Sequence, residues 1–354
     1  MKVSSHPAVK GRGAPANPSG RFERLAFVQE PGDEPDDDRP ALPTELFRDT
    51  SKSILAFNDS PDVPMDASVN PYRGCEHGCI YCYARPYHEY LGLSAGADFE
   101  SKIFVKENAA ALLREALSAK SWTPQVIGLS GVTDPYQPVE RKLRITRACL
   151  EVLEECRNPV AVITKNHLVT RDIDLLASLA QHQAAQVFLS ITTLDDDLAR
   201  VMEPRASRPA LRLEAVRKLR EAGIPVGVMV APIIPALTDH EVPAILEAAA
   251  QAGAMMAGCT VVRLPHGVKD LFEAWLEAHA PLRKEKVLNR LRAMRDGKLN
   301  DPKFGSRMVG QGPFAESIHQ VFDLHRRKLG LNQRLTLSTQ AFRRPGGSQM
   351  RLFG

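Results

Sequence analysis

Three of the six cysteines in this 354-residue chain lie close together. Cys75, Cys79 and Cys82 fall in the segment NPYRGCEHGCIYCY, where their spacing is C-x3-C-x2-C. Three thiolates on one short loop indicate a metal or iron–sulfur site. Two kinds of site fit the spacing. The thiolates alone can hold a four-iron cluster that leaves one iron open to another ligand, whereas His77 or His88 would complete a closed zinc site.

The remaining cysteines have a different setting. Cys149 and Cys156 lie in the amphipathic segment LRITRACLEVLEEC, and Cys259 opens the apolar run CTVVRL, so we expect all three to be buried as small apolar residues. No apolar run approaches the ~20 residues that cross a bilayer, and the N-terminus lacks a secretory signal. These features predict a cytoplasmic location without a membrane partner, where cysteines stay reduced and clustered thiols bind metal.

Short apolar strands alternate with helical patterns from residue 68 onward. Strands are predicted at residues 68–72, 126–130, 160–164, 186–192, 225–230 and 260–264. Helical periodicity covers residues 106–119, 141–156, 170–183, 208–223 and 238–253. This alternation predicts an α/β fold with a parallel sheet, closed as a partial (β/α)6 barrel. The cysteine loop follows the first strand, at the end of the sheet where such folds place their chemistry.

Composition divides the chain into four segments. Residues 1–44 are rich in Pro, Gly, Ser and Asp and are predicted to be a disordered tail. The barrel is expected over residues 45–265, a basic helical extension over 266–340 and a flexible tail over 341–354. From residue 281 to the end, Lys and Arg exceed Asp and Glu by 11, although the whole chain has a net charge of only +4. This excess favours either a polyanion-binding surface or an ordinary solvated helical surface.

The motifs resemble those of radical S-adenosylmethionine (SAM) enzymes. Tyr81 occupies the aromatic position of the pattern C-x3-C-x-aromatic-C. The chain is most similar to the group named for spore photoproduct lyase, also described as DNA repair photolyase-like, from about Asn70 to Leu264. The motifs that follow the cysteines in the expected order are GLSGVTDPYQPVE, VITKNH, FLSITT, MEPRASRPALRLEAVRKLREAG and VGVMVAPIIP.

This resemblance implies a [4Fe-4S] cluster on Cys75, Cys79 and Cys82, with SAM chelating the open iron. One electron from an external donor then cleaves SAM to a 5′-deoxyadenosyl radical. The residues that the resemblance places around SAM are Tyr83 at the adenine, Lys165 at the carboxylate, and the hydroxyls of Ser130, Thr133, Ser190 and Thr192. There are alternatives to these SAM contacts. Lys165 could be an ordinary surface lysine, and the four hydroxyls could bond only to neighbouring strand ends.

Two polar turns follow predicted strands and supply candidate contacts to substrate or SAM. VTDPYQPVE carries Asp134, Tyr136, Gln137 and Glu140, and MEPRAS carries Glu203 and Arg205. Alternatively, Asp134 serves only to form a turn before Pro135, and Glu203 and Arg205 form only a local ion pair.

The chain departs from the lyases at one position. Spore photoproduct lyases carry a cysteine just after the second strand that returns a hydrogen atom to the thymine radical, whereas this chain reads SGVTD there, with Val132 or a neighbour in its place. The sequence therefore disfavours the dimer-splitting reaction and leaves the hydrogen-atom donor open. A nucleic acid such as DNA, in a repair-like reaction, remains a candidate substrate.

The C-terminus suggests a protein partner. Gln349, Met350, Leu352 and Phe353 form a pattern similar to the Q-L/M-x-L-F peptide that docks on the bacterial β sliding clamp, although a frayed tail or a strand folded back on the barrel also fits. Two functions are therefore weighed: a radical SAM enzyme, and a non-catalytic nucleic-acid-binding protein stabilised by zinc or a cluster.

Overall fold

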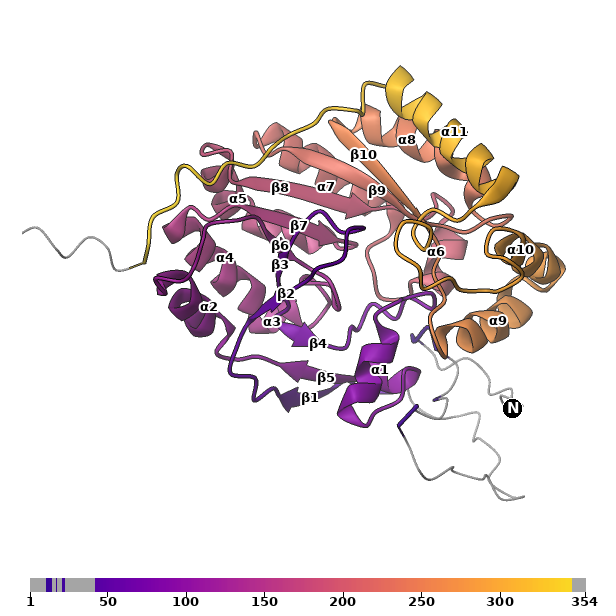
Figure 1. Ribbon diagram of the computed structural model, residues 1–354, viewed down its shortest axis with the longest axis horizontal. Coiled ribbons are helices and arrows are strands. Elements are labelled where there is room, and N and C mark those ends of the chain that lie inside the picture. Colours follow the sequence, from indigo (N-terminus) through magenta and orange to yellow (C-terminus); the bar gives the residue numbers. More distant parts are fainter. Residues whose placement is uncertain (1–10, 15–16, 18–20, 23–41, 346–354) are drawn as a thin grey trace, which may run out of the picture.

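A seven-stranded sheet forms the centre of the protein (Figure 1). The computed structural model describes residues 11–14, 17, 21–22 and 42–345. Six parallel strands follow one another in chain order, and β2 pairs antiparallel at one edge. The strands, in spatial order, are β2 (Leu55–Phe57), β3 (Ala67–Val69), β6 (Ile127–Leu129), β7 (Val160–Thr164), β8 (Ala185–Ser190), β9 (Val226–Ile233) and β10 (Met256–Val261).

This sheet confirms the predicted partial barrel. Within the described residues β10 and β2 do not pair with each other, so the barrel is open. β7 reads VAVIT and is buried along almost its whole length, as expected of a parallel strand covered on both faces. Five of the six strand ends differ from the sequence prediction. β3 stops at Val69, β6 at Leu129, and β8 at Ser190 so that Thr192 lies beyond the strand, whereas β9 continues to Ile233. The last strand was predicted over residues 260–264, but β10 runs from Met256 to Val261.

Helices between the strands bury their apolar faces against the sheet. They are α2 (Ala109–Ser118), α4 (Ile145–Cys156), α5 (Ile173–Ala180), α7 (Pro209–Glu221) and α8 (Val242–Gln251). In α4, Leu150 and Leu153 are fully buried in the main core, and each such side chain contributes roughly 1.5–3 kcal/mol. Cys149 and Cys156 are also buried, and Cys259 is half-buried, which agrees with their predicted packing role.

A second, three-stranded sheet was not predicted. It contains β1 (Glu45–Arg48), β5 (Lys102–Val105) and β4 (Tyr72–Arg73), in that spatial order. β4 ends two residues before Cys75, and the Cys75 amide donates to the carbonyl of Phe99. This small sheet therefore fixes the entry to the cysteine loop. Shorter helical segments complete the barrel: η1 (Arg85–Leu91), α1 (Ala97–Ser101), α3 (Glu140–Leu143), η2 (His167–Asp172), α6 (Asp196–Met202) and η3 (Asp239–Glu241).

The C-terminal extension is helical, as predicted, and closes one side of the cysteine loop. α9 (Val268–His279) and α10 (Pro281–Ala293) share an apolar cluster with Cys79 and Ile80 of that loop. α11 (Gly312–Lys328) lies outside α8 and β10 (Figure 1). Residues 331–333 then run along the outer edge of β10, where Asn332 bridges to Met256.

Both predicted tails contain anchored residues. Most of residues 1–44 lie outside the described part, but the amides of Gly13 and Ala14 donate to the Glu100 carboxylate. Of the tail predicted over residues 341–354, residues 346–354 lie outside the described part. Arg343 is held by the carbonyls of Cys156 and Glu155, which corrects the expectation of a tail free from residue 341. No helix among the described residues is long and apolar enough to cross a membrane.

Candidate active site

The three clustered cysteines lie on one loop at the carboxyl end of the parallel sheet. Cys75 and Cys79 are each 7% exposed, and Cys82 is half-buried. Gly74 and Gly78 shape the loop with φ angles of 81° and 68°, and a Cβ at Gly74 would lie 2.9 Å from the Phe99 carbonyl oxygen. The loop therefore requires glycine at its first turn.

The electrostatics of the loop suit a cationic ligand. Burial raises the pKa of the Cys75, Cys79 and Cys82 thiols, and for Cys75 the negative charges of the other two raise it further. Three thiolates are stable here only with compensating positive charge, which bound iron or zinc supplies. Among the described residues, no three His, Cys, Asp or Glu side chains lie close enough to hold a single metal ion. In a four-iron cluster each thiolate binds a different iron, so the cluster does not require that convergence.

Both histidines proposed for a zinc site have protein partners. His77 is 1% exposed, and its Nδ1 lies 3.3 Å from Asp134 Oδ2 while its Nε2 lies 3.1 Å from Asn166 Nδ2. His88 packs edge-on against Phe99, and its Nε2 lies 3.0 Å from the Lys102 carbonyl oxygen. Both nitrogens of His77 have partners and Nε2 of His88 is bound to the Lys102 carbonyl, so the arrangement disfavours the closed zinc site.

Asp134 is a structural carboxylate that joins three segments of the site. Besides His77, it accepts hydrogen bonds from Thr164 Oγ1 at 2.6 Å and from the Lys165 amide at 2.8 Å. It also accepts from the Tyr136 amide, as the turn-forming alternative requires. Burial alone would raise the pKa of Asp134, but His77 and these donors lower it below its ordinary value.

A buried ion pair, Arg85 with Glu100, is hydrogen-bonded to the backbone of the cysteine loop. Arg85 and Glu100 are both 0% exposed, and Arg85 Nη2 lies 2.5 Å from Glu100 Oε1. The guanidinium also donates to the carbonyls of Cys79 and Gly78 within the loop. Arg85 therefore fixes the backbone that carries the thiols, and the sequence analysis missed it because arginine three residues after a cysteine has no distinctive pattern.

A second buried network surrounds Glu203. Its carboxylate contacts Tyr81 and Arg212 directly and forms an ion pair with Lys165, with 3.1 Å between Nζ and Oε1. Lys165 Nζ also donates to Thr192 Oγ1 and to the Ala231 carbonyl, each at 3.0 Å. Burial opposes ionisation of Glu203, but Arg212 and Lys165 outweigh it and lower the carboxyl pKa. This network links Tyr81, the aromatic residue of the cysteine motif, to the ends of β7, β8 and β9.

The other residues expected around SAM line the approach to the loop. The Tyr83 hydroxyl donates to the Gly131 carbonyl at 2.6 Å, and the ring is 46% exposed. Thr133 and Gln137 are tied to the Gly74 carbonyl, and Ser130 Oγ donates to the Thr133 carbonyl. Ser190 is 7% exposed at the end of β8, and its carbonyl accepts from Arg212. Of this group, Tyr83 presents the largest open surface.

The structure places several of the predicted contact residues in the protein interior. Tyr136, Gln137 and Glu140 are all 0% exposed: Tyr136 donates to Asp172, Glu140 accepts from Arg171, and Gln137 donates to the Gly74 carbonyl. They therefore have no open surface for substrate or SAM. Glu203 does not pair with its neighbour in sequence, because Arg205 instead contacts Glu76 at 3.0 Å. The pairing follows from the fold: α7 brings Arg212 to Glu203, and the cysteine loop brings Glu76 to Arg205.

Val132 borders the thiols. It is half-buried and packs with Cys75 and Cys82 in a small apolar cluster. The segment SGVTD, where the sequence analysis expected Val132 or a neighbour in place of the lyase cysteine, therefore lies against the cysteine loop.

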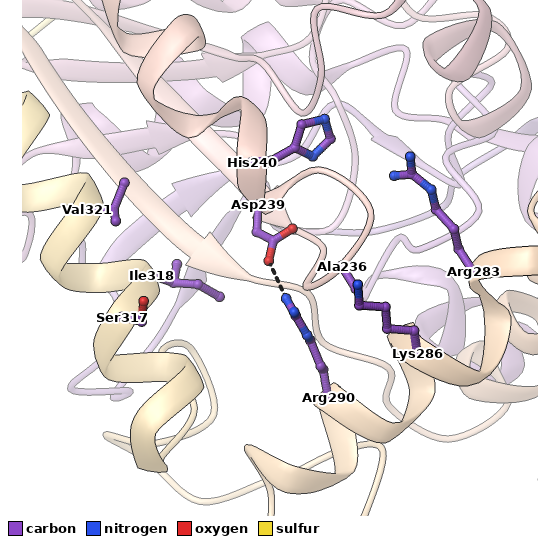
Figure 2. Close-up of a pocket in the computed structure, with 9 residues that line it drawn as sticks. All are labelled: Ala236, Asp239, His240, Arg283, Lys286, Arg290, Ser317, Ile318 and Val321. Atoms are coloured by element: carbon purple, nitrogen blue, oxygen red, sulfur yellow. Dashed lines mark hydrogen bonds and ion pairs between the residues drawn. The ribbon is translucent and has the colours of Figure 1, made fainter.

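A separate groove of about 450 Å³ lies between the loop after β9 and helices α10 and α11. Figure 2 shows Arg283, Lys286 and Arg290 of α10 on one side and Ile318 and Val321 of α11 on the other. Arg290 is neutralised by Asp239 at 3.0 Å. No residue that the sequence analysis selected lines this groove, so it is not part of the site around the cysteines.

Comparison with known proteins identifies relatives over the same region. The sequence profile of the Radical SAM superfamily matches residues 69–249. An uncharacterized protein of Mycobacterium tuberculosis (strain H37Rv) is 37% identical over 235 residues, which cover 64% of this chain and 68% of the relative. The radical SAM Nalpha-GlyT isomerase of Pseudomonas phage M6 is 27% identical over 175 residues, covering 49% of this chain and 34% of that protein.

Solved structures share the fold. A spore photoproduct lyase variant superposes with a TM-score of 0.58 at 15% identity, covering 83% of this chain and 82% of the other. A second variant, with bound AdoMet and dinucleoside spore photoproduct, gives a TM-score of 0.55 at 16% identity and covers 80% and 78%. At this identity the likeness establishes the fold alone.

Proposed function

The chain belongs to the radical SAM superfamily, and from this premise we propose that it cleaves S-adenosylmethionine reductively at a [4Fe-4S] cluster held by Cys75, Cys79 and Cys82. The observation that carries the proposal is the single loop with three clustered thiols, two buried and one half-buried, at the carboxyl end of the parallel sheet. Its donor set fits the cluster, because three soft thiolates hold three irons and leave the fourth open.

The cofactors supply the bond cleavage. When bound, the reduced cluster donates one electron to SAM, whose sulfonium carbon–sulfur bond breaks to give methionine and a 5′-deoxyadenosyl radical. The electron comes from an external one-electron donor. The protein contributes positioning: Arg85 holds the loop, and the apolar cluster with α9 and α10 excludes water from the Cys79 side.

The residues around SAM form the next part of the proposal. Tyr83 borders the adenine, and Ser130, Thr133, Ser190 and Thr192 provide hydroxyls near the methionyl group and ribose. Lys165 remains the cation proposed for the SAM carboxylate, although its three Nζ protons already have protein partners. The variant Lys165→Gln therefore tests two roles. If Lys165 binds the SAM carboxylate, KM for SAM should rise; if it only supports the network around Glu203, the free energy of unfolding should fall while KM for SAM stays the same.

Enzyme status follows from the superfamily and sets aside the non-catalytic alternative. A nucleic acid substrate is proposed because the basic part of the extension, from residue 281 onward, begins with α10, which shares an apolar cluster with Cys79 and Ile80 of the cysteine loop. A cytoplasmic location is proposed because an oxygen-sensitive cluster on free thiols suits a reducing compartment.

The test is anaerobic reconstitution with iron and sulfide, then reduction in the presence of SAM and assay of 5′-deoxyadenosine. We expect the wild type to bind iron and to release 5′-deoxyadenosine. Cys79→Ala should lose both properties, whereas the matched variant Cys259→Ala, with a half-buried cysteine outside the loop, should keep them. A wild-type protein that retains one zinc per chain and leaves SAM intact would contradict the proposal.

A further inference from the structure

The six tyrosines of the chain fall into two groups. Three are buried, and each donates its hydroxyl to a carboxylate: Tyr72 to Glu140, Tyr81 to Glu203 and Tyr136 to Asp172. The other three are on the surface and are 46%, 54% and 66% exposed: Tyr83, Tyr87 and Tyr90. Burial and carboxylate partners explain the first group as structural. Among the described residues no carboxylate accepts from the second group: Tyr83 donates to the Gly131 carbonyl, and the Arg21 guanidinium carbon lies 5.7 Å from the centre of the Tyr90 ring.

The exposed tyrosines form an aromatic stripe that begins beside the cysteine loop. Tyr83 directly follows Cys82, and Tyr87 and Tyr90 lie on η1, the next element. The ring centres of Tyr87 and Tyr90 are 6.3 Å apart, and Tyr90 lies 5.3 Å from Phe22, which is also exposed. Contiguous exposed aromatic rings on a soluble protein mark a binding surface.

A cation without a carboxylate partner borders the stripe. The Arg263 guanidinium carbon lies 5.5 Å from the centre of the Tyr83 ring. Within the described part of the chain, its Nη1 contacts the sulfur of Met308 at 3.6 Å, and its buried Nε has no hydrogen-bond partner. Among the described residues no acidic side chain forms an ion pair with Arg263, whereas Arg307 nearby is neutralised by Asp62 at 2.5 Å. A partly buried, unneutralised guanidinium next to exposed aromatic rings favours an anionic, ring-bearing ligand.

We propose that Tyr87 and Tyr90 of this stripe stack the bases of a single-stranded nucleic acid while Arg263 contacts its phosphate backbone. The inference rests on the proposed function, because it places the strand beside the loop at which SAM is cleaved. Single strands are favoured over duplexes because stacking on a protein ring requires an accessible base face, which a duplex hides between its own base pairs. Every base has a ring face that can stack, so the aromatic stripe selects single-stranded nucleic acid without preferring a base sequence.

Binding is tested by fluorescence anisotropy with the reconstituted protein, using a labelled oligo-dT of about 12 nucleotides, within the usual site size for single strands. Neither SAM nor reductant is present. Replacing Tyr87 and Tyr90 together by Ala should weaken binding at least tenfold, since each stacked base contributes about that factor. Replacing both by Phe should restore it, because the stacking face is kept. Phe57→Ala, which removes a 69%-exposed ring on the β2 edge, is the matched control and should bind as the wild type does.

The proposed contact between Arg263 and a phosphate is tested by the salt dependence of the binding affinity. Arg263→Gln should reduce the slope of log affinity against log salt concentration by about 0.7, the value for one phosphate of a single strand. Lys286→Gln, in the groove of Figure 2, should leave the slope unchanged. A change in slope for Lys286→Gln and none for Arg263→Gln would place the strand in that groove and overturn the proposal.

Two further results would overturn it: an alanine double variant that binds like the wild type, or duplex DNA that binds as tightly as the single strand. Equal iron content in all variants shows that each is folded and loaded. The experiments distinguish failure of the nucleic-acid-binding proposal from failure of the proposed radical SAM function. Tyrosine-independent binding with normal release of 5′-deoxyadenosine rejects only the stripe, whereas tyrosine-dependent binding without SAM cleavage rejects only the radical chemistry.

Discussion

Arg85 and Glu100 form an ion pair that is wholly shielded from solvent, directly beneath the loop that carries the three cysteines. Arg85 donates to two loop carbonyls, and Glu100 accepts from the amides of Gly13 and Ala14. The pair therefore ties the cysteine loop, α1 and the N-terminal segment together.

Arg85→Gln should remove this support and leave a buried carboxylate without its cation. Removing one partner of a buried ion pair costs about 3–5 kcal/mol of unfolding free energy. We expect that loss in urea unfolding, together with reduced iron content after reconstitution. Arg114→Gln breaks an exposed pair with Glu155 and serves as the control, with an effect of at most about 1 kcal/mol. Normal iron loading in Arg85→Gln would show that the pair does not position the thiols.

His88 should make stability depend on pH. Burial against Phe99 lowers its pKa from 6.5 to about 4, and this effect outweighs the hydrogen bond from the ring to the Lys102 carbonyl, which favours the protonated form. Between these values the unfolded chain binds the proton and the folded chain does not, so stability is full above about pH 6.5 and falls as the pH decreases toward 4. The shift corresponds to roughly 3 kcal/mol. Urea titrations of wild type and His88→Gln should show the steeper acid loss in the wild type; parallel curves would contradict this prediction.

Val132 predicts that the chain does not carry out the lyase reaction. The apolar side chain of Val132, which packs against the cluster that contains Cys75 and Phe99, has only strong C–H bonds and lacks the weak S–H bond from which a hydrogen atom passes to a thymine radical. We expect the reconstituted wild type to cleave SAM but to form no thymine dinucleotide from dinucleoside spore photoproduct, as followed by chromatography. Repair by the wild type would show that another residue serves as donor. Val132→Cys places a thiol at the same position and tests whether this residue alone is limiting.

The C-terminal segment SQMRLFG is proposed to bind the β sliding clamp through Gln349, Met350, Leu352 and Phe353. These residues lie outside the described part of the chain. A labelled peptide with this ending should bind the clamp saturably, because three apolar side chains can fill a groove. Changing Leu352 and Phe353 to Ala should weaken binding by more than tenfold, since large apolar anchors dominate such interfaces. A peptide that does not saturate, or that tolerates both changes, excludes this docking role.

The sequence by itself determined the α/β alternation, the parallel sheet and the cysteine loop after its first strand. These features depend on local spacing: β-branched runs and helical periodicity are read over a few residues, and the three thiols lie within one loop. The small sheet of β1, β5 and β4 was not predictable in this way, because its short strands carry no clear alternation and pair segments that are distant in sequence: Glu45 pairs with Lys102, and Tyr72 pairs with Val105.

Only the tertiary structure decided which charges pair. Any Arg is chemically suited to any carboxylate, so the sequence could offer a pair between the neighbours Glu203 and Arg205 only as an alternative to their contacting substrate or SAM. The fold instead places Arg212 and Lys165 on Glu203 and brings Arg205 to Glu76. It also buries Tyr136 and Glu140 while exposing Tyr87 and Tyr90, although all four are polar residues in loops or short helices. Burial depends on which segments pack together, and that information lies in contacts distant along the chain.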